Sequence, residues 1–392
     1  MKRTLARALI AALLLSSFPA TAPAEPGVTD GQIVLGSCVP LSGGNMINGV
    51  AYSSGAKAYF DWLNAEKGGI HGRKVSLVVE DDGYDPEKAV TCYKSLLDKN
   101  VFATGLSIGT PTAAKYVLMA ENNKVPFIAN AGGPGLMYDN ARKYVFAVRA
   151  SYGDEIKIGV EHLWKEVGAR KFGVIYQNDA LGASVLDGVT NALKAFNATI
   201  AAQGSYPRNT VDIDAGYATV KAANPDVVYI GGVTVPMGEI LKKAKADGWK
   251  AIFVPLPARD AELIKVAGDA TEGILVGNAV PPENSTGLAM VDQYQKAMKK
   301  YMPTTARGGL SLLGFVDASV MAEGLKRAGK DLTRDKLISA LEDIKDFDIG
   351  LGPEFKLKYG PGDHKGFDAI AFTTIKGGKV QKIGDWKATF AR

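Results

Sequence analysis

Three loops in this sequence carry residues that could hold a small molecule, and each follows a segment typical of a buried strand. The first loop spans residues 107–112, where Thr110 suits the N-cap of a helix and Pro111 its first position. Free backbone N–H groups and the positive end of the helix dipole at such a start attract a carboxylate or another acceptor. An ordinary capped helix explains the same residues equally well, because every helix has such an end.

The second loop is rich in glycine, and the third begins another helix. Residues 130–135 read Asn-Ala-Gly-Gly-Pro-Gly, so the backbone there can approach a ligand closely, or the loop simply needs positive φ angles. Residues 176–182 also follow a strand, where Asn178 or Asp179 could act only as a helix cap. Ligands of open α/β sheets bind beyond the carboxyl ends of the strands. The three loops together therefore form the candidate binding site.

Patterns of common enzyme and metal sites do not occur in this sequence. The histidines His71, His162 and His364 fall in a turn, a helix and a late loop, without the spacing of metal ligands. The sequence contains no G-x-S-x-G elbow, no phosphate-binding P-loop and no C-x-x-C pair. We therefore expect no catalytic residue, no metal and no cofactor.

Segments typical of strands and helices alternate through most of the chain, in two successive series. Strands are expected near residues 33–36, 75–79, 101–106 and 125–129 in the first series, and near 144–148, 172–176, 227–230, 251–254 and 274–276 in the second. Helices are expected near residues 52–63, 86–99, 111–121, 154–167, 181–195, 211–223, 236–247 and 259–267. Continuous β-branched strands with helical crossovers predict parallel sheets covered on both faces. We therefore expect an α/β protein with two doubly wound, Rossmann-like lobes.

The last quarter of the chain has a different pattern. Residues 286–341 are nearly all typical of helix, and residues 367–386 are typical of a hairpin that turns at Gly377-Gly378. A helical block without strands of its own must pack on an existing sheet, so we expect the chain to return to the first lobe and then to cross again. The expected N-terminal lobe comprises residues 25–148 and 280–365, and the C-terminal lobe residues 149–279 and 366–392, joined by three crossings.

The first 24 residues have the order of a cleaved export signal. Lys2, Arg3 and Arg7 precede a short apolar run, and Ala22-Pro23-Ala24 is a small-residue cleavage site. The apolar run is too short to span a bilayer, which needs about 20 residues. We expect cleavage after Ala24 and a soluble periplasmic protein of 368 residues, which is 392 less 24 and enough for two domains.

Charge and cysteine content bear on the partners and the compartment. The formal net charge of +5 falls to +2 when the three basic residues of the signal leave, and acids interleave with the remaining lysines and arginines. Nothing in that pattern favours nucleic-acid binding. Cys38 and Cys92 either form a disulfide in the oxidising periplasm or are two small buried side chains.

A set of short segments gives the chain a resemblance to one family over most of its length. The segments are Pro40-Leu41-Ser42-Gly43, Asn64-Ala65-Glu66-Lys67-Gly68-Gly69-Ile70-His71-Gly72-Arg73, Asp81-Asp82-Gly83-Tyr84-Asp85-Pro86 with Ala89, Val145-Phe146-Ala147-Val148-Arg149, and Gly231-Gly232 after a strand. In their order and spacing the chain resembles ABC-transporter substrate-binding proteins of the branched-chain amino-acid (leucine/isoleucine/valine) type. The resemblance implies a type I periplasmic binding fold of the Venus-flytrap kind that closes on its ligand by a hinge. It also implies a membrane permease and ATPase as partners, and a monomer without catalytic activity.

The resemblance also gives an expectation for the ligand. Amino-acid binders of this family hold the ligand carboxylate with a serine hydroxyl and backbone N–H groups. They hold the ammonium with a threonine, a backbone carbonyl and a glutamate of the second lobe. The matched segments place Gly109 at the serine, Gly133 at the threonine and Leu256 at the glutamate. Since an ammonium buried without a partner costs several kcal/mol, we expect a ligand other than a standard α-amino acid.

The rest of the expected site is apolar and roomier than in those binders. The aromatic positions of the family pocket become Asn48, Leu181 and Val233. Arg259 and the helix start at Thr110 suit a carboxylate without an amine, such as an aromatic or aliphatic acid, although Arg259 could instead form a surface salt bridge. The expected ligand-binding residues are Asn48, Gly109, Thr110, Ala131, Gly132, Gly133, Tyr152, Leu181, Val233, Thr234, Leu256 and Arg259.

Other functions fit the same sequence features. A signalling receptor would use the same two-lobed capture protein, and neighbouring genes would distinguish a permease and ATPase from a sensor kinase. A branched-chain amino-acid binder with an atypical pocket is a further alternative. Binding of a regulatory protein would need an exposed apolar patch, which the sequence does not locate.

Overall fold

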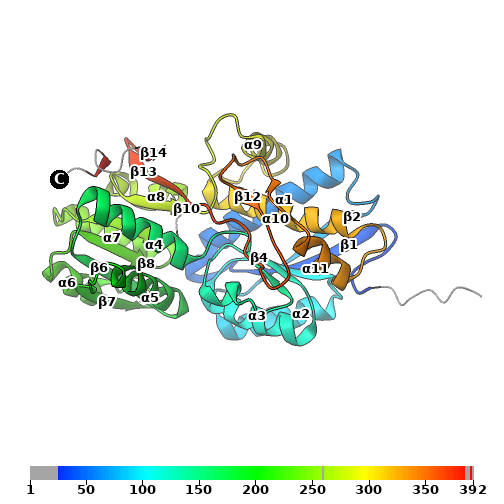
Figure 1. Cartoon of the computed structure of the whole chain (residues 1–392), viewed down its shortest axis with the longest axis horizontal. Coiled ribbons are helices and arrows are strands. Elements are labelled where there is room, and N and C mark those ends of the chain that lie inside the picture. The colour runs from blue at the N-terminus through cyan, green and yellow to red at the C-terminus, as the bar shows by residue number, and fades with distance from the viewer. Residues whose placement is uncertain (1–24, 258–259, 385–388, 391–392) are drawn as a thin grey trace, which may run out of the picture.

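Two parallel β-sheets, each covered by helices, form two lobes that lie side by side (Figure 1). The computed structural model describes residues 25–257, 260–384 and 389–390. Within these ranges one parallel sheet has five strands and the other has four. Each sheet is built from strand–helix–strand crossovers, which confirms the predicted α/β class with two doubly wound lobes. The proposed signal, residues 1–24, lies outside the described residues.

The first lobe is built around the five-stranded sheet. Its elements from this part of the chain are β1 (Gln32–Val39), α1 (Met46–Glu66), β2 (Lys74–Asp81), α2 (Pro86–Asp98), β3 (Ala103–Ser107), α3 (Thr110–Asn123), β4 (Phe127–Asn130) and β5 (Val145–Phe146). The strand order is β2-β1-β3-β4-β5. Residues 144–148 were predicted to start the second series, which is wrong, because Val145 and Phe146 pair with Phe127 and Ile128 of the first sheet.

Three later helices cover the first sheet. They are α9 (Ala289–Tyr301), α10 (Gly309–Ala328) and α11 (Arg334–Glu342), and Figure 1 places α10 and α11 beside α1 and β1. Helices α1 and α10 meet backbone to backbone because of two glycines. A Cβ on Gly55 would lie 1.8 Å from the carbonyl oxygen of Ser311, and a Cβ on Gly314 would lie 2.1 Å from that of Tyr52. The helical block therefore shares one hydrophobic core with β1 and α1.

The second lobe is built around the four-stranded sheet, in the order β7-β6-β8-β9. Its elements are α4 (Tyr152–His162), β6 (Phe172–Asn178), α5 (Ala180–Lys194), β7 (Ala202–Pro207), α6 (Asp214–Ala222), β8 (Val227–Gly231), α7 (Thr234–Ala246), β9 (Ile252–Leu256) and α8 (Asp260–Ala267). Strand β7 was not predicted. Its sequence, AQGSYP, contains a glycine and a proline and lacks the β-branched run of the other strands.

An antiparallel sheet completes the second lobe. Strands β10 (Leu275–Asn278), β13 (Ala371–Lys376) and β14 (Lys379–Lys382) form it, in that order. The hairpin turns at Gly377 and Gly378 as predicted, and both have positive φ angles, 57° and 69°. Residues 274–276 were expected in a parallel sheet, whereas Leu275 pairs antiparallel with Thr374. The short strands β11 (Phe347–Asp348) and β12 (Lys356–Leu357) pair with each other.

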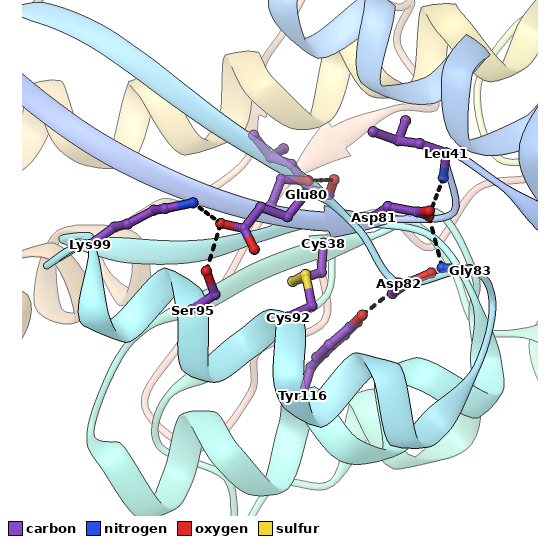
Figure 2. Close-up of a disulfide and its surroundings, with 12 residues drawn as sticks. Cys38, Leu41, Glu80, Asp81, Asp82, Gly83, Cys92, Ser95, Lys99 and Tyr116 are labelled. Atoms are coloured by element: carbon purple, nitrogen blue, oxygen red, sulfur yellow. Dashed lines mark hydrogen bonds and ion pairs between the residues drawn. A yellow bond between two sulfur atoms is a disulfide. The ribbon is translucent and has the colours of Figure 1, made fainter.

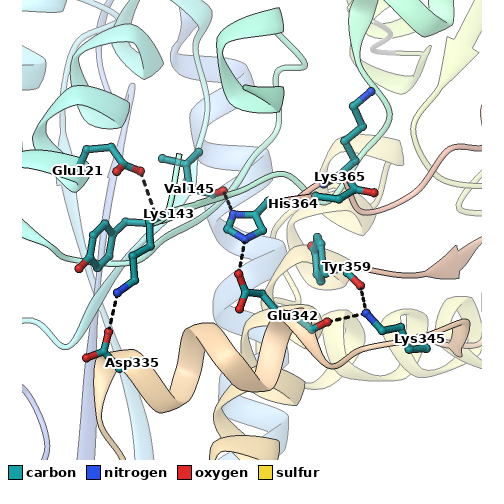
Figure 3. A network of polar contacts seen from close by, with 11 residues as sticks. Glu121, Lys143, Val145, Asp335, Glu342, Lys345, Tyr359, His364 and Lys365 are labelled. Carbon is teal, nitrogen blue, oxygen red and sulfur yellow. Dashed lines mark hydrogen bonds and ion pairs between the residues drawn. The ribbon is translucent and has the colours of Figure 1, made fainter. Parts of the chain in front are cut away.

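The last crossing between the lobes is fixed to β5 by polar contacts around His364 (Figure 3). The ring of His364 bonds the carbonyl oxygen of Val145 (2.9 Å) and the carboxylate of Glu342 (3.1 Å), and it stacks on Phe146. Tyr359 donates to the carbonyl oxygen of Ala147 at 2.8 Å. The segment of the last crossing, around His364, therefore runs alongside residues 145–147, which lead into the first crossing.

Cys38 and Cys92 form a disulfide inside the first lobe (Figure 2). It joins the end of β1 to α2, and both residues are buried. Beside it, Asp81 accepts hydrogen bonds from the N–H groups of Leu41 (2.7 Å) and Gly83 (2.8 Å). The loops that follow β1 and β2 are thus held together at the edge of the sheet that faces the other lobe.

Candidate functional site

Strand ends of the two lobes face each other across a closed interface. Thr234, at the start of α7, donates to the side-chain oxygen of Asn48 in α1 (2.9 Å). Arg208 of the second lobe donates to the carbonyl oxygen of Tyr84 in the first lobe (3.0 Å). The described residues of the expected ligand-binding set are all buried: Asn48, Gly109, Thr110, Ala131, Gly132, Gly133, Tyr152, Leu181, Val233, Thr234 and Leu256. Arg259 lies outside the described residues.

Helix α3 begins one residue earlier than predicted, and this changes what Thr110 does. Gly109 is the N-cap, with a φ of 134° that favours glycine, and Thr110 is the first helical residue. The Thr110 hydroxyl therefore does not cap the helix. It is buried, and it has no hydrogen-bond partner among the described residues. Leaving a buried hydroxyl without a partner costs about 1–3 kcal/mol. A bound molecule that forms a hydrogen bond with this group would remove that cost.

A glycine on the neighbouring loop leaves space beside Thr110. A Cβ on Gly132 would lie 3.4 Å from the Thr110 hydroxyl and 2.9 Å from the hydroxyl of Tyr152. Asn130 holds this loop in place, because its side-chain oxygen accepts from the N–H of Gly132 (2.7 Å) and its amide donates to Ser107 (2.9 Å). The hydroxyls of Thr110 and Tyr152 thus lie beside one glycine near the start of α3, an arrangement suited to an acceptor group.

The ring of Tyr84 packs over Gly109. A Cβ on Gly109 would lie 2.5 Å from the hydroxyl of Thr112 and 3.1 Å from the Tyr84 ring. A serine at this position, which the resemblance to amino-acid binders leads one to expect, would therefore need both neighbours to move.

Three interface residues were absent from the expected set. Tyr84 extends from the first lobe into the core of the second, where its hydroxyl accepts from the amide of Gln177 (3.4 Å). Gln177 and Tyr206 are neighbours on β6 and β7. The sequence offered a signal for Gln177, a polar residue at the end of an apolar strand. It offered little for Tyr206, because β7 itself was not predicted.

Two carboxylates beside the interface already have hydrogen-bond donors. Asp179 caps α5 by accepting from the N–H groups of Leu181 (2.9 Å) and Gly182 (3.2 Å), and its second oxygen accepts from Gln177. Burial raises the pKa of Asp179, although these bonds oppose the rise.

Asp82 is engaged in the same way. Its carboxylate accepts from the hydroxyl of Tyr116 (2.5 Å) and the N–H of Tyr84 (2.8 Å). Burial raises its pKa to about 6, and the bond from Tyr116 opposes this. Neither Asp82 nor Asp179 is therefore well placed to accept from the ammonium of an amino acid.

A metal centre and a membrane-spanning helix are two other kinds of site to consider. In the described residues, no group of three or more histidine, cysteine, aspartate or glutamate side chains could hold a metal ion. Over the same ranges, every helix is too short or too polar to cross a membrane.

Two parallel-sheet lobes closed over buried strand-end loops define a bilobal binding protein of the type I periplasmic fold. The chain belongs to the periplasmic binding protein family, whose profile matches residues 32–379. It is 26% identical to Leu/Ile/Val-binding protein homolog 7 of Brucella suis, over 91% of this chain and 90% of that protein. The relatives of this chain are substrate-binding proteins of the branched-chain amino-acid type and not enzymes.

Solved structures share the fold. A possible leucine/isoleucine/valine-binding protein from Rhodopirellula baltica matches with a TM-score of 0.86 and 25% identity, over 95% of this chain and all of that one. The fatty acid ABC transporter substrate-binding protein of Thermomonospora curvata matches with a TM-score of 0.80 and 23% identity, over 94% of this chain and 95% of that one.

Proposed function

We propose that this chain is the exported solute-binding component of an ABC importer and that it captures a carboxylic acid without an α-amino group. The observation that carries the proposal is the hydroxyl of Thr110, which is buried at the start of α3 without a partner among the described residues. Export and transport are supported by the proposed signal at residues 1–24 and by membership of the periplasmic binding protein family. The partners in this proposal are a membrane permease and an ATPase.

The groups around Thr110 favour an anion. A carboxylate there would accept from the Thr110 hydroxyl and from N–H groups in the first turn of α3, and the positive end of the helix dipole would stabilise its charge. We place the second carboxylate oxygen toward Gly132, beside which the hydroxyl of Tyr152 also lies.

The groups around the rest of the interface disfavour an amino acid. Leu256, the position of the family glutamate, is buried and apolar, and Gly133 has no side chain to donate or accept. The carboxylate of Asp179 is occupied by helix capping. Burying an ammonium ion here would leave it without the partner that compensates for lost hydration. The fold itself accommodates acids without an amine, since the Thermomonospora curvata neighbour is described as a fatty acid binder.

Calorimetry on the mature chain tests the proposal. We expect at least one of a panel of aliphatic and aromatic monocarboxylates to bind, and leucine, isoleucine and valine to bind at least about 100-fold more weakly, a difference of about 2.7 kcal/mol. The amides of the same acids serve as neutral controls and should bind poorly. Submicromolar leucine binding would contradict the proposal and favour an amino-acid binder with an atypical pocket.

The Thr110→Val variant tests the role of the hydroxyl directly. Valine keeps the shape and removes one donor to the ligand, so we expect the affinity for the best acid of the panel to fall about 10- to 100-fold, since a hydrogen bond to a charged group contributes about 1.5–3 kcal/mol. Stability should not fall, because no protein partner is lost.

A matched control for this variant lies far from the interface. Thr374 in β13 is also buried with a hydroxyl that has no partner among the described residues, so Thr374→Val makes the same change outside the site. An equal loss of affinity in both variants would rule out a specific role for Thr110.

A further inference from the structure

The second lobe presents its own pair of buried polar groups at the interface. Gln177 and Tyr206 stand in register at the carboxyl ends of β6 and β7. Gln177 is completely buried and Tyr206 is 1% exposed. Neither the side-chain oxygen of Gln177 nor the hydroxyl of Tyr206 has a hydrogen-bond partner among the described residues.

The neighbours of this pair explain its orientation. The amide nitrogen of Gln177 donates to Asp179 and to the hydroxyl of Tyr84, so its oxygen is the end left as an acceptor. The hydroxyl of Tyr206 extends to Gly232, where a Cβ would lie only 1.9 Å from it. Gly232 follows β8, next to Val233 and Thr234 on the closed interface, so a glycine there makes room for the tyrosine hydroxyl at the strand ends.

Tyr84 closes this region from the first lobe. Its ring packs in the core of the second lobe, and its carbonyl oxygen accepts from Arg208. A guanidinium nitrogen of Arg208 also lies 3.7 Å from a carboxylate oxygen of Asp85, so the charged end of this side chain faces the loop of the first lobe. Gln177 therefore lies where the two lobes meet, and Tyr206 stands in register with it at the strand ends of the second lobe, with its hydroxyl against Gly232.

The two groups require complementary partners. The Gln177 oxygen can only accept, whereas the Tyr206 hydroxyl can donate. A single hydroxyl group can donate to the first and accept from the second, and a purely apolar ligand would leave both buried and unsatisfied. We propose that Gln177 and Tyr206 form a hydroxyl-selective subsite, so that the ligand is a carboxylic acid that also carries a hydroxyl group. This inference rests on the proposed function, because it assigns the carboxylate of the same ligand to the first lobe.

Matched pairs of acids test the inference by calorimetry. The probes are benzoate and 4-hydroxybenzoate, phenylacetate and 4-hydroxyphenylacetate, butyrate and 4-hydroxybutyrate, and octanoate and 8-hydroxyoctanoate. They vary the distance between the carboxylate and the hydroxyl. In the pair of the right length, we expect the hydroxylated acid to bind about tenfold more tightly or better. A preference for an ammonium group in place of the hydroxyl, tested with 4-(aminomethyl)benzoate, would overturn the inference.

The Tyr206→Phe variant shows whether the preference comes from this subsite. It should lose most of the preference for the hydroxylated acid and bind the parent acid as the wild type does. Gln177→Met should lose the preference in the same way, but it also removes the donors to Asp179 and Tyr84, so Tyr206→Phe is the decisive variant. Tyr229→Phe is the matched control, because Tyr229 is another buried tyrosine whose hydroxyl has no partner in the described part of the chain, and this hydroxyl lies beside Gly159 of α4 instead.

The outcomes separate this inference from the proposed function. If acids bind but a hydroxyl changes the affinity less than about threefold in every pair, the subsite is wrong and the carboxylate site stands. If Tyr206→Phe keeps the wild-type preference, the subsite is also wrong. If no monocarboxylate binds, the proposed function fails and this inference fails with it.

Discussion

The Glu155→Ala variant is expected to lower the free energy of unfolding by about 3–5 kcal/mol, because it leaves a buried guanidinium without its carboxylate. Arg149 and Glu155 form an ion pair in which both side chains are only 3% exposed. Burial acts to lower the pKa of Arg149, but the charge of Glu155, its hydrogen bond and the nearby Tyr152 and Tyr138 together outweigh burial, and the pKa is raised. The arginine therefore stays charged, and its remaining acceptors are the carbonyl oxygens of Ala131 (3.2 Å) and Ala150 (3.0 Å).

Urea unfolding of the ligand-free protein measures this effect, and two further variants control it. Arg149→Met combined with Glu155→Leu removes both charges and should recover much of the loss, since well-packed apolar residues often replace a buried pair at little cost. Glu161→Ala breaks the ion pair with Lys165, an exposed pair at the end of α4, and should leave stability unchanged. A similar result for Glu155→Ala and Glu161→Ala would contradict the account.

The same ion pair connects the first crossing to the candidate site. Arg149 follows β5 and Glu155 lies in the first turn of α4, so the pair joins the lobes where the chain first crosses. Its bond to Ala131 reaches the loop that carries Gly132, which Asn130 holds from the other side. A loss of this pair should therefore also weaken carboxylate binding, because the space beside Thr110 depends on the position of that loop.

Hydrophobic patterning was enough to predict most of the fold. Apolar segments such as β8, which is buried along its whole length, are typical of parallel strands in an α/β chain. The exceptions are elements whose sequences carry little of that signal. Strand β5 is only two residues long, and β10 is apolar like the parallel strands although its partner β13 comes from the end of the chain. Pairing of segments so far apart cannot be read from local pattern.

The site was predictable only in outline. The loops after β3, β4 and β6 could be identified because strand ends are common binding positions. Whether each polar group has a hydrogen-bond partner could not be predicted, because this depends on the backbone geometry of single residues. Thr110 was predicted to cap its own helix, and the positive φ of Gly109 instead moves the helix start and frees the hydroxyl. The position of the Tyr206 hydroxyl depends on Gly232, a residue from another strand end, because a Cβ there would lie 1.9 Å from it.

Reduction of the disulfide between Cys38 and Cys92 is expected to lower the free energy of unfolding by about 4 kcal/mol on the chain-entropy model. The bond closes a loop with a sequence separation of 54, so it restricts the unfolded chain substantially. Comparing oxidised wild-type protein with protein reduced in urea and refolded under reductant measures the effect without the cavity that a Cys→Ala change would leave in this buried cluster. Equal unfolding midpoints would show that the bond contributes nothing.

Ligand affinity should respond to this reduction much less than stability does. The loops that follow β1 and β2 are tied together by Asp81, through Leu41, Ser42 and Gly83, and not by the disulfide itself. Burial acts to raise the pKa of Asp81, but its bond from the Ser42 hydroxyl and the backbone bonds outweigh it and the pKa is lowered. The carboxylate thus remains an acceptor when the sulfurs are reduced, and Tyr84 keeps its place over Gly109. If affinity instead fell in step with stability, the disulfide and not Asp81 would position this side of the site.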